Sequence, residues 1–156
     1  MHSIRKASHK DIPRVMELLH QVNMVHHLGR PDLFKAGTKY TADTLEELFQ
    51  NPQRPVFVAT DGEDKVLGYA FCIFQGYEND QLMCDIRTLY IDDLCVDEQM
   101  RGQHIGRELY EYVKQFAKDA GCYNVTLNVW SLNTAAQKFY ESCGLKPQKV
   151  GMECIL

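Results

Sequence analysis

The residues best suited to chemistry in this sequence form a glycine-containing loop, residues 97–107, between an expected strand and an expected helix. Backbone N–H groups at a helix N-terminus, together with the helix dipole, bind anions such as a pyrophosphate. Gly102 and Gly106 would let the backbone approach such a group, and Arg101 and Arg107 would add positive charge. The loop matches neither a G-x-G-x-x-G fingerprint nor a P-loop. By itself it indicates phosphate binding only weakly, because glycine-bearing helix starts are common.

Two stretches taken together resemble the GNAT family of N-acetyltransferases. The first runs from Leu94 through the arginine–glycine loop to Leu109, and resembles the acetyl-CoA motif of that family. The second covers residues 133–145 and resembles the second family motif. The family pattern R-x-x-G-x-G has a glycine where this chain has His104. A histidine still has an N–H that can reach a phosphate if its φ is helical, so we expect binding to survive.

The resemblance implies acetyl-CoA as the co-substrate, with no metal. The strand before the loop would bind the pantetheine arm through its backbone, whether or not its side chains also belong to the core. The loop amides would bind the pyrophosphate, and the second motif would contact the middle of the cofactor. The expected binding residues are Leu94, Cys95, Val96, Arg101, Gly102, Gln103, His104, Ile105, Gly106, Arg107, Asn133 and Ala136.

Tyr140 and a carboxylate are expected to carry the acid–base chemistry. Aminolysis of a thioester releases a thiolate that a nearby phenol can protonate, and the resemblance places Tyr140 there. The attacking amine must first lose a proton, since an alkylammonium has a pKa of about 10.4. Strand alternation would put Asp92 and Asp93 on opposite faces, with Asp92 on the face of Leu94. Asp92 is therefore the predicted general base, acting directly or through a water.

The elements that must position these groups follow an α/β order. The β-α-β segment 86–129 should hold two parallel strands. The sequence predicts a single domain over residues 1–156, with a mixed, mostly antiparallel sheet of about seven strands flanked by about four helices. Expected strands are 3–7, 56–60, 66–74, 86–96, 125–130 and a last pair within 145–155. One expected helix begins near residue 11, and three more cover 43–50, 102–120 and 133–142. Residues 26–40 are expected to be irregular.

Composition narrows the classes of partner. The net charge is −4 and no basic run occurs, which disfavours nucleic acid and suits a cationic or neutral small molecule. No apolar stretch approaches the ~20 residues that cross a bilayer, so no membrane partner is expected. The six cysteines show no C-x-x-C spacing, and several lie in apolar runs. Read as reduced core residues, they predict a cytoplasmic protein.

The expected acceptor is the primary amine of a small molecule, acetylated by direct attack in a ternary complex. Residues 90–93 resemble the diamine and polyamine branch of the family. Acetylation of peptide or protein N-termini, or of aminoglycosides, stays open, as does a non-catalytic acyl-CoA-binding protein on the same fold. Loops at 24–40 and 75–85 would build the acceptor site, with His26, His27 and Trp130 as candidate lining residues. GNAT relatives often pair through C-terminal strands, and the apolar tail 152–156 predicts a homodimer.

Overall fold

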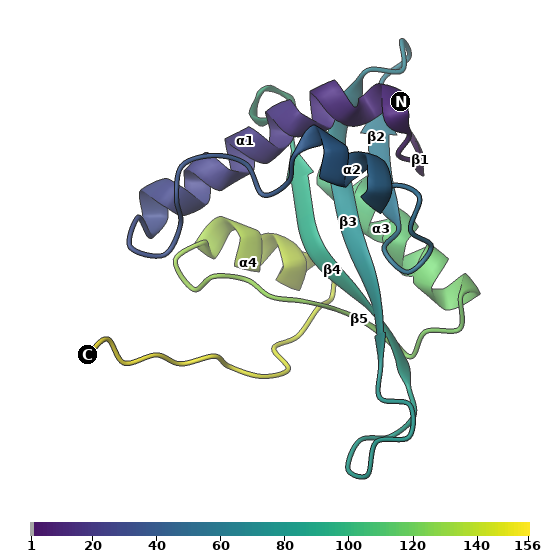
Figure 1. Ribbon diagram of the computed structural model, residues 1–156, viewed down its shortest axis with the longest axis vertical. Helices are drawn as coiled ribbons and strands as arrows, with labels where there is room; N and C mark the ends of the chain where they lie inside the picture. The colour runs from purple at the N-terminus through teal and green to yellow at the C-terminus, as the bar shows by residue number, and fades with distance from the viewer. Residues whose placement is uncertain (1) are drawn as a thin grey trace.

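Five strands form one mixed sheet in the order β1-β2-β3-β4-β5 in the structure, a computed structural model that describes residues 2–156 (Figure 1). Neighbouring strands from β1 to β4 are antiparallel, whereas β4 and β5 are parallel as the β-α-β segment predicts. The mixed, mostly antiparallel α/β class is confirmed. The strands are β1 (Ser3–Lys6), β2 (Val56–Thr60), β3 (Val66–Gly76), β4 (Arg87–Val96) and β5 (Asn124–Leu127).

Helices cover both faces of this sheet. One core cluster joins α1 and α2 to one face, and a second joins α3 to the other face. Strand β2 is buried along its whole length because both of its faces are covered. The four helices are α1 (Ile12–Gly29), α2 (Ala42–Leu48), α3 (Ile105–Asp119) and α4 (Thr134–Ser142), with short 3-10 turns η1 (His9–Asp11) and η2 (Glu98–Met100).

Helix α3 shows how the sequence pattern sets the packing. Ile105, Leu109, Val113 and Ala117 recur every four residues and are all buried against the sheet. The helix ends just before Gly121, which adopts a φ of 78° that suits glycine at a helix C-terminus. This firmly packed helix fixes where its N-terminal loop lies relative to β4.

The chain after α4 differs from the expected pair of strands at 145–155. Residues 146–156 are mostly exposed and form no strand, so the sheet has five strands instead of about seven. A strand needs a neighbouring strand to bond with, and this tail runs away from the sheet (Figure 1). One side chain of the tail, Glu153, forms an ion pair of 2.6 Å with Arg30.

Helix α1 also runs further than expected. It continues to Gly29, so His26 and His27 lie in its last turns and not in an irregular segment. The helix ends just before Arg30, whose amide still donates to the carbonyl of His26. It does not continue because Arg30 precedes Pro31, and a residue before proline disfavours the helical conformation. Within residues 2–156, no helix has the length and apolar character needed to cross a membrane.

The cysteines only partly match the core expectation. Cys72, Cys95 and Cys143 are buried, whereas Cys84 and Cys154 are exposed, and all six are free thiols.

Candidate active site

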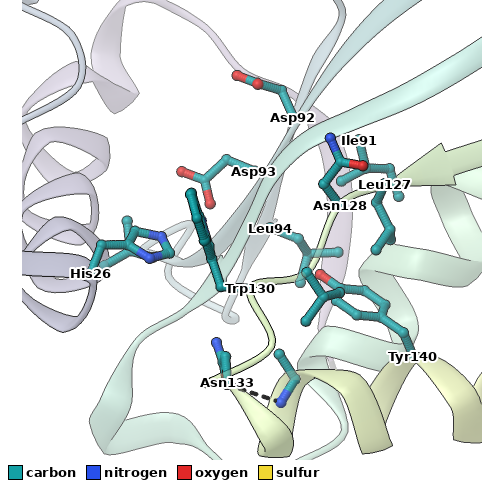
Figure 2. Close-up of a pocket in the computed structure, with 13 residues that line it drawn as sticks. His26, Ile91, Asp92, Asp93, Leu94, Leu127, Asn128, Trp130, Asn133 and Tyr140 are labelled. Carbon is teal, nitrogen blue, oxygen red and sulfur yellow. Dashed lines mark hydrogen bonds between the residues drawn. The ribbon is translucent and has the colours of Figure 1, made fainter. Parts of the chain in front are cut away.

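The site lies where β4 and β5 part. Strand β5 pairs only with Thr88–Ile91, so the following residues of β4 have β3 on one side and a free edge on the other. A pocket opens at this free edge (Figure 2). Residues from α1, β4, β5 and α4 line it, namely Val22, His26, Ile91, Asp92, Asp93, Leu94, Leu127, Asn128, Val129, Trp130, Asn133, Ala136 and Tyr140.

A bulge in β4 brings both carboxylates to this pocket. Ile91 pairs with Cys72 and Asp93 pairs with Phe71, which leaves Asp92 as an extra residue without a partner on β3. Strict alternation fails at such a point. The expectation that Asp92 and Asp93 lie on opposite faces was therefore wrong, since both line the same pocket.

Asp93 is the more deeply placed carboxylate. Burial raises its pKa to about 6, against the opposing effect of a 2.8 Å hydrogen bond donated by the hydroxyl of Tyr69. Tyr69 itself is fully buried. A carboxylate with a pKa of about 6 is ionised at neutral pH yet holds a proton more strongly than an exposed aspartate, as a general base should.

Asp92 is already engaged with cationic and phenolic donors. The ammonium of Lys39 lies 2.5 Å from its Oδ2, and the hydroxyl of Tyr40 donates to the same oxygen at 3.2 Å. Arg54 in turn donates to the Tyr40 hydroxyl at 3.0 Å. The Tyr40 ring stacks on Phe71, with ring centroids 5.4 Å apart. The loop between α1 and α2 is thus fastened to the rim of the pocket.

Tyr140 enters the pocket from the opposite side, on α4 (Figure 2). Burial, followed by the negative charge of Asp93, raises its pKa well above the ordinary value. The phenol is therefore fully protonated at neutral pH and is available as a donor. Its neighbour Phe139 packs edge-to-face against it at 5.1 Å between ring centroids.

The expected pyrophosphate loop ends at an uncapped helix. No side chain caps the N-terminus of α3, and the amides of Ile105, Gly106 and Arg107 have no acceptor within the helix. His104 precedes them with a φ of 64°, so it lacks the right-handed helical φ that was the condition for its own N–H to reach a phosphate. This left-handed conformation favours glycine, which is the residue that the family pattern has here.

Several of the expected cofactor residues also make contacts that hold helices α3 and α4 in place. Arg107 donates to the carbonyl of Ser142 at 3.0 Å, which ties α3 to α4. A Cβ on Gly106 would lie 3.2 Å from the ring of Phe139, so this glycine lets the two helices approach. Asn133 accepts a 3.1 Å bond from the amide of Ala136 and caps α4.

The other expected cofactor residues lie at the end of β4 or in the loop before α3. Leu94 lines the pocket on the free part of β4, while Cys95 is buried and Val96 packs against the α3 core cluster. Arg101, Gly102 and Gln103 are exposed in the loop before α3. Asp97, at the start of that loop, is held by Arg14 of α1, as well as by the amide of Gln99 at 3.1 Å.

Of the stretch 24–40 expected to build the acceptor site, only His26 lines the pocket in the described residues, and the segment after α1 packs against it. His26 stacks on Phe34 at 5.0 Å, and Phe34 packs edge-to-face on Trp130 at 5.3 Å, so His26 and Trp130 form one wall. His27 instead donates to the carbonyl of Phe34 at 2.6 Å and is not among the pocket residues. In the described chain, no residue from 75–85 lines this pocket, so the expectation that this loop helps to build the acceptor site gains no support from it.

Sequence reasoning missed Lys39, Tyr40 and Tyr69 as parts of this site. Tyr69 lies in an apolar strand and looks like a core residue, and Lys39 and Tyr40 lie in an irregular loop. A lysine and a tyrosine next to each other in an expected acceptor loop were the only available signal.

The geometry fits a CoA thioester. The free edge of β4 offers backbone groups for an extended pantetheine arm, and the uncapped start of α3 offers amides for a pyrophosphate. The free edge of β4 borders the pocket that holds Asp93 and Tyr140, because Leu94 lines that pocket.

Comparison with known proteins agrees with this reading of the fold. The model of the acetyltransferase (GNAT) family matches residues 22–145. A crystal structure of a mutant BH1408 protein from Bacillus halodurans is 31% identical, with a TM-score of 0.94 over 99% of both chains.

Two curated enzymes differ in how much of the chain they match. The glucosamine 6-phosphate N-acetyltransferase of Arabidopsis thaliana is 33% identical over 63 residues, only 40% of either chain. The peptidyl-lysine N-acetyltransferase YjaB of Salmonella typhimurium is 28% identical over 94% of this chain and 84% of its own. On the extent of the family match and the shared fold, the chain belongs to the acetyltransferase (GNAT) family.

Proposed function

We propose that the protein transfers the acetyl group of acetyl-CoA to a primary alkylamine of a small molecule, by direct attack in a ternary complex. The observation that carries this proposal is the 2.5 Å contact between Asp92 and the ammonium of Lys39. The rim of the pocket already binds an alkylammonium, so it has the charge and the geometry to bind another.

In this proposal the two carboxylates divide the work. Asp92, which the sequence favoured as the base, binds and orients the acceptor ammonium. Asp93 accepts the proton that the amine loses, because burial has raised its pKa to about 6 and brought it closer to that of the donor. The proton passes directly or through a water.

Tyr140 is the proposed general acid. Its raised pKa keeps the phenol protonated, and it lies across the pocket from the carboxylates. A proton or hydrogen bond from this phenol would stabilise the negative charge that develops on the departing sulfur. Bound acetyl-CoA supplies the activated acetyl carbonyl.

The proposed cofactor contacts are mainly to the backbone. Leu94 to Val96 would bond the pantetheine arm along the free edge of β4, and the amides from Arg101 to Arg107 would bind the pyrophosphate. Asn133 and Ala136 line the pocket and would contact the middle of the cofactor. We treat residues 1–156 as one catalytic domain.

A lysine side chain in a polypeptide is the second candidate acceptor. The chain's own Lys39 reaches the pocket from a segment without regular secondary structure, so a lysine carried on another extended segment has the same chemistry. The match to a peptidyl-lysine acetyltransferase over most of the chain supports this candidate. The aminoglycoside, peptide N-terminal and non-catalytic alternatives have no comparable contact in their favour.

Thiol release from acetyl-CoA tests the proposal. The acceptor panel contains polyamines, free lysine, glucosamine 6-phosphate, an aminoglycoside, a lysine-containing peptide with a blocked N-terminus and a peptide with a free N-terminus. Turnover with polyamines or free lysine supports a small-molecule acceptor, whereas turnover confined to the blocked peptide supports the second candidate. Binding of CoA without turnover of any amine would refute the catalytic proposal.

A further inference from the structure

Lys39 occupies the contact with Asp92 that the proposed function assigns to an acceptor ammonium. It lies on the segment between α1 and α2, and its Nζ lies 2.5 Å from Oδ2 of Asp92 at the pocket rim. Its side chain is 44% exposed, so the lysine is neither buried in the core nor free in solvent.

Neighbouring contacts hold the lysine there. Tyr40, the next residue, also donates to Asp92 and is stacked on Phe71, which fixes the backbone beside Lys39. The Lys39 ammonium lies 5.5 Å from the centroid of the Tyr40 ring, a cation–π distance. The segment thus presents its amine to the pocket at little entropic cost.

The charge of Lys39 also acts on the inner part of the pocket. Its positive charge lowers the pKa of Asp93, against burial, and together with burial it lowers the pKa of His26. Both of these residues line the pocket, as does Asp92, which the ammonium contacts directly.

We propose that Lys39 is an internal acceptor: in the absence of an external amine, the enzyme transfers the acetyl group of its own bound acetyl-CoA to Nζ of Lys39. The inference rests on the proposed acetyl-transfer function. When no external amine is bound, the amine that contacts Asp92 is that of Lys39, a residue of the same chain.

The step balances with groups that are present. Lys39 nitrogen forms a bond to the acetyl carbon, and the C–S bond of the thioester breaks with its electron pair remaining on sulfur. The ammonium loses two protons in all. One of them replaces, on Tyr140, the proton that Tyr140 gives to the thiolate, and the other reaches solvent through Asp93.

Acetylation would remove the positive charge of Lys39, and with it the ion pair to Asp92. The carboxylate would then be free for an external ammonium. Internal acetylation therefore changes the enzyme from a state that contains its own amine to a state with an open acceptor site.

The test is incubation of the purified full chain with acetyl-CoA alone, followed by peptide mapping with mass spectrometry. Lys35 is the matched internal control, since it is an exposed lysine on the same segment. We expect Lys39 to be acetylated at least tenfold faster than Lys35, at a rate per chain that does not change with protein concentration. We also expect the Tyr140→Phe variant to slow modification of Lys39 but not of Lys35.

A second readout uses external amines. Lys39→Ala and the acetylated wild type should both show a lower KM for a cationic acceptor than the unmodified protein, whereas Lys39→Arg should keep the higher KM because it retains the cation. Equal modification of Lys39 and Lys35, or a rate that rises with protein concentration, would overturn the inference.

The assay separates the two proposals. If an external amine is acetylated while Lys39 is not, the internal acceptor is refuted and the enzyme activity stands. If CoA binds and neither the panel nor Lys39 is acetylated, both proposals fail together.

Discussion

The buried hydroxyl of Tyr69 donates a 2.8 Å hydrogen bond to Asp93, which lies directly in the proposed path of proton transfer. The bond favours the ionised carboxylate, while burial of Asp93 favours the neutral acid more strongly. The balance leaves a carboxyl with a pKa of about 6, and this value has consequences that can be measured.

The first concerns the pH dependence of the reaction. Below pH 6 Asp93 is protonated and cannot accept a proton, so kcat/KM should rise with pH through a limb at about 6. Asp93→Asn should lower kcat about 100-fold or more and remove that limb. Asp92→Asn is the matched control, and should keep the limb while raising KM for cationic amines. A limb that persists in Asp93→Asn would exclude Asp93 as the base.

The second concerns stability. Because the pKa of Asp93 is higher in the folded protein than in the unfolded chain, its ionisation favours unfolding. This penalty is absent below about pH 4 and is complete above about pH 6. Asp93→Asn should therefore raise the free energy of unfolding at pH 8 by up to about 3 kcal/mol and have little effect at pH 4. Urea unfolding at the two pH values measures the difference; equal effects would contradict this account.

The third concerns Tyr140. The Tyr140→Phe variant has no hydroxyl to donate a proton to the departing thiolate. It should therefore reduce kcat about 100-fold while the Kd for CoA stays the same. Steady-state kinetics and calorimetric titration with CoA give the two quantities. Tyr123→Phe, which changes an exposed tyrosine just before β5, is the control and should behave as wild type. Equal loss of CoA binding in Tyr140→Phe would indicate a packing role.

The fourth concerns the contact between α3 and α4. A Cβ on Gly106 would meet the Phe139 ring at 3.2 Å, closer than ordinary packing allows. Gly106→Val should destabilise the fold by about 2 kcal/mol and displace Tyr140, which follows Phe139 on α4. Adding Phe139→Leu should restore part of both stability and kcat. Additive effects in this double-mutant cycle would mean that the two positions are independent.

The fifth concerns assembly. Val150, Met152 and Ile155 are each more than three-quarters exposed on the extended tail, which suits a segment that adds to another copy of the chain. We expect the full chain to scatter light as a dimer of 18.0 kDa units, and a chain lacking residues 147–156 to be monomeric. A monomeric full chain at micromolar concentration would refute the homodimer.

Local patterns predicted the frame of the site well. The four-residue spacing of apolar side chains in α3 and the capping asparagine of α4 act within a few residues, so the sequence is sufficient to place those helices. The two motifs also predicted a loop at the N-terminus of α3 and drew attention to Tyr140, which lines the pocket.

The parts that were wrong depend on contacts between distant segments. The bulge at Asp92 arises from the register of β4 against β3, which a strand pattern read alone does not contain. The pKa that suits Asp93 to act as a base depends in part on the hydrogen bond from Tyr69, which lies 24 residues earlier in the sequence. The engagement of Asp92 by Lys39 depends on the path of a loop, and loop paths follow from tertiary packing.

The bulged strand also affects how proteins of this kind can diverge. Ten residues of β4 provide the pairing with β3, the free edge proposed for the cofactor and both carboxylates, so an insertion or deletion there would turn one of these groups to the wrong face. The loop between α1 and α2 can change length or composition without moving that strand. Descendants of one gene should therefore acquire new acceptors through residues 30–41, while the interval from Asp92 to Leu94 keeps a constant length.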